Sequence, residues 1–126
     1  MDYETAREIL TEFADALPEG IFNQLDGGII LQPETLRHPQ GGGLYIIGQY
    51  HNQPYGLGRY VSVYYGSFIA VHGNTSFENQ RRALRDVLYH ELTHHIESLA
   101  GDRSLEKQDE VDLDNFRNRN SPPWND

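Results

Sequence analysis

The sequence predicts an α+β domain, and three observations lead to that prediction. Apolar residues recur at helical spacing over residues 2–16, and a similar pattern starts near residue 75. The region between carries short runs of β-branched and aromatic residues separated by Gly and Pro, which is typical of strands. The expected order is therefore a helix, a small sheet, a long helix and a last helix, which is an α+β arrangement.

The first helix is predicted over residues 2–16. Its apolar face consists of Ala6, Ile9, Leu10, Phe13, Ala14 and Leu17. Pro18 and Gly20 follow and end the helical pattern.

Strands are predicted next, in three runs. The first is a short strand around residues 29–31, and the second is "LYIIGQY" at 44–50. The third run, "RYVSVYYGSFIAVHG" at 59–73, predicts two strands or one strand bent around Gly66.

The long helix is predicted from near Thr75 to about Ala100. Thr75 and Glu78 have the spacing of a capping box, and Gly101 is the expected stop. A narrow sector of its helical wheel is apolar and should face the core: Phe77, Leu84, Leu88, Leu92 and Leu99. A last helix is expected over residues 104–117.

The composition fits one domain, expected over residues 1–120, with a flexible tail at 121–126. The chain has 126 residues, of which 37% are hydrophobic, so a packed core is possible. The net charge of −9 disfavours nucleic acid and anionic membranes as partners, because both attract basic surfaces. No run approaches the roughly 18 apolar residues of a membrane helix, and "MDYETAREIL" lacks signal-peptide features. A soluble cytoplasmic protein is expected.

The stretch "YHELTHH" at 89–95 carries the chemistry. His90, Glu91 and His94 match the HExxH pattern, and cysteine is absent, so any metal site must use His and carboxylates. Residues four apart share a helix face, which lets His90 and His94 present two imidazoles to one zinc ion at about 2.0–2.1 Å.

Glu91 lies about 100° around the helix axis from His90, where it can activate a zinc-bound water as general base. The competing interpretation is a solvated helix face with coincidental histidines. His95 falls in the apolar sector and is predicted to be packed or to support a metal ligand, with direct metal binding as the competing role.

A third metal ligand is not evident from the motif. A final helix folded back after Gly101 would bring positions 109–113 level with the two histidines, with Asp109 at the centre of its apolar face. A carboxylate among apolar neighbours is unfavourable unless it is paired or coordinated, so Asp109 is the first candidate, either as the ligand or as the hydrogen-bond partner of a ligating histidine. Glu106, Asp102 and Glu97 are the alternatives, and ordinary surface charge is the competing explanation for each.

"DVLYHELTHHIESLAG", "GLGRYVSVYYGSF" and "GDRSLEKQDE" together resemble the small bacterial zincin-like metallopeptidases, over nearly all of residues 2–117. The resemblance implies a zincin-like fold, with a small mixed sheet packed on the HExxH helix, and zinc-dependent peptidase activity. It makes His90 and His94 zinc ligands and Glu91 the catalytic base. Shorter relatives resemble HExxHxxGxxD, but Glu97 and Ala100 occupy the Gly and Asp positions here, so the third ligand stays open.

Two functions are therefore expected from the sequence. One is a zinc metallopeptidase that hydrolyses a peptide or protein substrate; the other is a non-catalytic metal-binding or scaffold module on a degenerate zincin fold. In zincins an edge strand holds the peptide, and "SFIAVHG" is the candidate by analogy. Tyr64, Tyr65 and His72 are candidates to stabilise the oxyanion, with packing as the alternative for each. The oligomeric state is not predicted.

Overall fold

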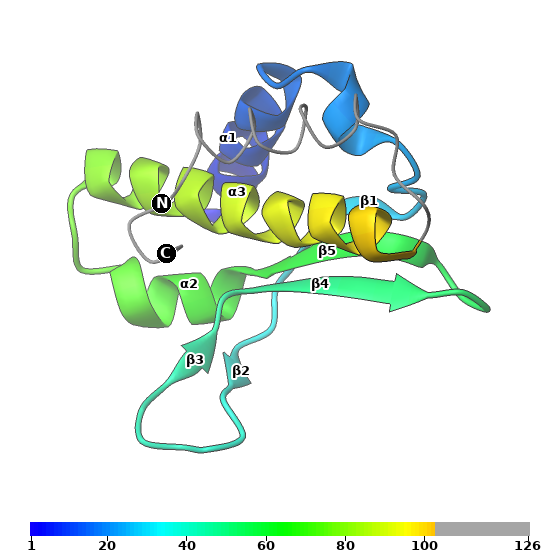
Figure 1. Cartoon of the computed structure of the whole chain (residues 1–126). Helices are drawn as coiled ribbons and strands as arrows, with labels where there is room; N and C mark the ends of the chain where they lie inside the picture. Colours follow the sequence, from blue (N-terminus) through cyan, green and yellow to red (C-terminus); the bar gives the residue numbers. More distant parts are fainter. Residues whose placement is uncertain (103–126) are drawn as a thin grey trace.

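The computed structural model describes residues 1–102, which form three α-helices and two small sheets. Helix α3 (Phe77–Asp102) crosses the molecule over strands β4 (Gly48–Gln53) and β5 (Gly58–Tyr64), as Figure 1 shows. Helix α1 (Tyr3–Asp15) packs on the other side of α3. The candidate functional residues therefore lie on a helix that is held between a sheet and a second helix.

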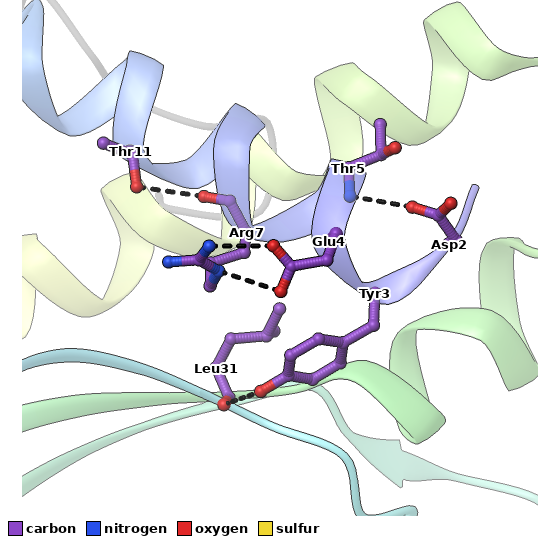
Figure 2. Close-up of polar contacts among 7 residues, drawn as sticks. All are labelled: Asp2, Tyr3, Glu4, Thr5, Arg7, Thr11 and Leu31. Carbon is purple, nitrogen blue, oxygen red and sulfur yellow. Dashed lines mark hydrogen bonds and ion pairs between the residues drawn. The ribbon is translucent and has the colours of Figure 1, made fainter.

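Helix α1 begins where the sequence predicts, and its start is tied to the sheet. The Asp2 side chain caps the helix by accepting a hydrogen bond from the Thr5 backbone N–H at 2.8 Å. Figure 2 shows this cap together with the Tyr3 hydroxyl, which donates to the Leu31 carbonyl of β1 (Gly28–Gln32). The same view shows the exposed Arg7–Glu4 ion pair, at 2.8 Å, one turn apart on α1.

The main sheet has the strand order β1-β5-β4, with β1 parallel and β4 antiparallel to β5. Strands β2 (Leu36–Arg37) and β3 (Tyr45–Ile46) form a separate antiparallel pair. The predicted strand over 44–50 is thus divided at Ile47 between two sheets. Strand β4 lies at the edge of the main sheet and beside α3.

The core forms where α1, α3 and β5 meet. Its fully buried members from α3 and β5 are Leu84, Leu88, Leu92, Val61 and Val63, and Ala6, Ile9 and Leu10 of α1 join them. The predicted apolar sector of α3 is confirmed at its centre. The prediction is wrong at Phe77, which is 56% exposed. Phe77 is the first residue of α3 and lies almost two turns before Leu84, the first fully buried leucine of the helix.

The third predicted strand run is wrong after residue 64. Residues 58–64 form β5, but "YGSFIAVH" forms helix α2 (Tyr65–His72). Tertiary packing outweighs the β-propensity of this segment. A Cβ on Gly66 would lie 2.8 Å from the Glu34 backbone, and the Ser67 hydroxyl bonds both backbone polar groups of Leu36. The helix places both small residues against the β2 segment and buries Phe68 completely.

Helix α3 differs from prediction at both ends. It begins at Phe77, and Ser76 is the capping residue, since its hydroxyl accepts from the Asn79 N–H at 3.1 Å. The Thr75 hydroxyl instead donates to the His72 carbonyl. At the other end the helix continues through Gly101, which the sequence marked as its stop, because a glycine inside a helix costs only about 1 kcal/mol.

Among the described residues, no helix is long and apolar enough to cross a membrane. The expected last helix over 104–117, the tail at 121–126 and the candidate ligands Glu106 and Asp109 lie outside the described residues.

Candidate functional site

His90 and His94 converge on one point beside α3. Their Nε2 atoms lie 3.2 Å apart, and the two rings stand nearly perpendicular, at 86°. Two nitrogens bound to one tetrahedral zinc at 2.0–2.1 Å would lie about 3.3 Å apart. The observed distance therefore fits two ligands of a common metal ion, and it also fits a hydrogen bond between the two rings.

The environment of His90 favours its neutral form. Burial of the half-buried ring lowers its pKa, the nearby His94 lowers it further, and Glu97 partly offsets both effects. A neutral imidazole is the form that coordinates a metal. The helix thus presents a donor nitrogen that does not first have to lose a proton near neutral pH.

Glu91 follows His90 in the sequence, lines a cleft together with it, and is buried, with 7% of its surface exposed. Burial raises its pKa from 4.5 to about 7. A carboxyl group with a pKa near the working pH can both accept and return a proton. Glu91 therefore has the property that a general base requires, in addition to its place in the motif.

Gly48 of β4 makes room for the Glu91 side chain. A Cβ at this position would lie 3.1 Å from Cγ and Oε2 of Glu91 and 2.7 Å from Cγ1 of Val87. Strand β4 approaches α3 closely here because residue 48 has no side chain. The sequence offered a signal for this contact, a lone glycine inside the strand pattern "LYIIGQY", which often marks a close backbone approach.

His95 is packed, as predicted, and holds α3 to its neighbours. It is fully buried, and its two ring nitrogens lie 2.8 Å from the Tyr50 hydroxyl on β4 and 2.8 Å from the Asn23 carbonyl. Burial is the main cause that lowers its pKa. This histidine fixes the rotation of the helix that carries the other two.

Glu97 lies one turn beyond His94, with Oε1 3.7 Å from the His94 Nδ1. This is the ring nitrogen that does not face His90, so in this position Glu97 can orient the His94 ring. Within residues 1–102 no group of three or more His, Asp, Glu or Cys side chains could hold a metal ion. The described residues therefore provide two converging donors, and Asp109 remains a prediction.

A cleft of about 550 Å³ opens beside the motif. Its walls come from the face of α3 that carries His90 and Glu91, from the Tyr45–Gly48 segment, and from His72 at the end of α2; the remaining lining residues are Asn79, Arg82, Ala83, Asp86 and Val87. These α3 positions recur every three or four residues before His90. A helical wheel extended toward the N-terminus of α3 would have found them.

The structure corrects the expected substrate strand. "SFIAVHG" lies mostly in helix α2 and cannot serve as an edge strand; β4 is the edge strand beside the motif. Of the three oxyanion candidates, His72 lines the cleft, whereas Tyr64 and Tyr65 do not. The Tyr64 hydroxyl donates to Gln49, and the Tyr65 hydroxyl donates to the Met1 carbonyl, so both serve packing.

Comparisons with models of protein families and with curated proteins find no match. Among solved structures, the chain is similar to a conserved hypothetical protein from Thermus thermophilus. The two share 31% sequence identity and a TM-score of 0.70, over 81% of this chain and 100% of the other. The chain therefore belongs to the same family as this conserved hypothetical protein.

Proposed function

We propose that the protein is a zinc-dependent metallopeptidase with a zincin-like fold. The observation that carries the proposal is the 3.2 Å separation of the His90 and His94 Nε2 atoms, with the buried Glu91 lining the same cleft as His90. The HExxH helix packed on a small mixed sheet, with an edge strand alongside, supports the fold assignment. The substrate would be a peptide or a protein segment.

His90 and His94 would hold the zinc ion together with one acidic residue. When bound, zinc lowers the pKa of water to about 7 and polarises a carbonyl group. Glu91 would accept the proton of the attacking water as general base and pass it to the departing amine as general acid. Burial, which raises the pKa of this carboxyl to about 7, favours the protonated form that returns the proton. The β4 backbone at Gly48 lies close to the Glu91 carboxyl and limits how far this carboxyl can move on that side.

The third ligand is proposed to be Asp109, with Glu106, Asp102 and Glu97 as alternatives. Zinc affinity would be measured for Asp109→Asn, Glu106→Gln, Asp102→Asn and Glu97→Gln. Loss of a ligand should weaken binding most, whereas loss of a residue that orients a ligand should weaken it about 10- to 100-fold. The variant with the largest loss identifies the ligand.

A second candidate function is metal binding without catalysis. The observation in its favour is that the described residues supply only two converging donors. Such a module would bind zinc through His90 and His94, and no step would depend on Glu91.

The two functions are separated by a cleavage assay on a peptide library. Zinc-loaded wild type should cleave peptides, a chelator should abolish cleavage, and Glu91→Gln should lose it while it still binds zinc. Cleavage that survives Glu91→Gln would contradict the proposal, and zinc binding without cleavage in wild type would favour the second function.

Metal analysis of the same samples provides the matched control. His90→Ala and His94→Ala should each lose zinc, whereas His38→Gln should retain it, because His38 does not line the cleft and its Nδ1 accepts from the Gln40 N–H. Protein that takes up no zinc after loading would exclude both functions.

A further inference from the structure

The cleft is long enough for several residues of an extended peptide. Its α3 wall runs from Asn79 to His90, which are 11 positions apart and thus about 16 Å apart along the helix axis at 1.5 Å per residue. An extended chain advances about 3.3 Å per residue, so about five residues match this length. The motif lies at one end of the wall, and Arg82 with Asn79 lies at the other.

Arg82 is a cation that the described part of the chain leaves without an ion pair. Its neighbours on α3 are both paired, Arg81 with Glu12 of α1 and Arg85 with Asp86. Within residues 1–102, no ion pair or hydrogen bond involves the exposed Arg82 guanidinium, which lines the cleft. An unpaired guanidinium beside an amide side chain is suited to bind a carboxylate with two parallel hydrogen bonds.

The edge of β4 determines which end of a peptide reaches Arg82. The Ile47 carbonyl accepts from the Tyr64 N–H of β5, so the backbone N–H and C=O of Gly48 point away from β5 toward the free edge. Gly48 of β4 lies next to Val87 and Glu91 of α3. Two residues later on β4, Tyr50 lies next to His95, which is further along α3. Strand β4 and helix α3 therefore run in the same direction.

A peptide added antiparallel to β4 would run opposite to α3. Its carboxyl end would point toward the N-terminal half of the helix, where Arg82 lies. Antiparallel pairing is the more stable arrangement and the more common one. The direction of an antiparallel peptide and the positive charge of Arg82 therefore both favour a peptide carboxylate at this end of the cleft.

We infer that the cleft binds the C-terminal segment of a peptide, with Arg82 pairing with the terminal carboxylate. This inference rests on the proposed function and names its substrate class: peptides with a free C-terminus. Arg82 precedes Glu91 by nine positions, or about 13 Å, so the scissile bond would lie about three or four residues from the C-terminus. The activity would be the removal of short C-terminal peptides.

The test is a binding titration that does not require turnover. The probe is a pool of N-terminally labelled hexapeptides of mixed sequence, prepared as free acids and as C-terminal amides, and added to the zinc-loaded full chain carrying Glu91→Gln. The free acids should bind about tenfold more tightly than the amides, since the charge-assisted pair is lost with the amide. Adding Arg82→Gln should remove this difference by weakening the binding of the acids alone.

Arg81→Gln provides the matched control, because it makes the same change of charge one residue away, on the side of α3 that faces α1. The preference for acids should persist in this variant. Equal binding of acids and amides, no binding of either, or a preference that survives Arg82→Gln would each overturn the inference.

Cleavage by the wild type separates this inference from the proposed function. If cleavage depends on Glu91 but acids and amides bind alike, the peptidase assignment stands and the C-terminal specificity is wrong. If the Arg82-dependent preference is observed without cleavage, the binding mode stands and the catalytic assignment is wrong.

Discussion

The buried Glu91 carboxyl makes the free energy of unfolding depend on pH in a defined direction. Its pKa is about 7 in the folded chain against an ordinary value of 4.5, so the folded state binds its proton more tightly than the unfolded state. Stability is therefore lost as the pH rises from 4.5 through 7, where the folded state must carry a buried charge. Glu91→Gln keeps a similar shape and removes this charge at every pH.

The expected size follows from the two pKa values. Between about pH 5.5 and about pH 8, titration of Glu91 should destabilise the wild type by about 2 kcal/mol more than Glu91→Gln. The lower end of this pH range stays above the sequence pI, which is near 5.0 and marks the pH at which solubility is poorest. The variant should thus gain stability relative to wild type as the pH is raised, although it lacks the proposed catalytic base.

Urea unfolding with a chelator present, followed at several pH values, measures this difference. Other titrating groups, including the buried His95, contribute equally to both proteins and cancel. Glu8→Gln, on the exposed surface of α1, is the control and should show no such trend. A difference between wild type and Glu91→Gln that is constant with pH, or that falls as the pH rises, would refute the reasoning.

Further predictions concern packing around the site. Gly48→Ala should destabilise the fold by about 1–3 kcal/mol, because the new methyl would lie 2.7 Å from a Val87 methyl. Gly20→Ala is the control and should change stability little, since a Cβ there would have nothing within 4 Å. Equal effects of the two variants in urea unfolding would contradict the close approach of β4 to α3. Gly101→Ala should stabilise the chain by up to about 1 kcal/mol, since the helix runs through this position into open space; a loss of stability would indicate that the helix ends there. His95→Phe should lower the free energy of unfolding by about 2–4 kcal/mol, because it removes the hydrogen bonds to Tyr50 and to the Asn23 carbonyl. A loss below about 1 kcal/mol would show that these two bonds contribute little.

The relation between the motif residues could be predicted from the sequence because it is local. A helix places residues four apart on one face whatever surrounds it, so the convergence of His90 and His94 follows from their spacing once the segment is helical. The burial of His95 follows in the same way from its place among the leucines of the core sector. The amphipathic first helix was predictable for the same reason.

The surroundings of the motif depend on segments that are distant in the chain. The composition of "YGSFIAVH" favours a strand, and it becomes helix α2 because Gly66 and Ser67 fit against the segment that includes Leu36. The lone glycine in "LYIIGQY" indicates a close backbone approach, but nothing in its spacing shows that the partner is the Glu91 carboxyl. Those contacts arise from packing between elements, which no local pattern specifies.

By itself, the sequence determined the α+β class, the amphipathic helices and the HExxH motif on one helix face, because backbone geometry converts residue spacing directly into shared faces. Only the tertiary structure decided that β4 is the edge strand at the site, that the Glu91 carboxyl is buried against Gly48, and that Arg82 faces the same cleft. The reason is that burial, cleft shape and a raised pKa are properties of several segments packed together, and no single segment contains them.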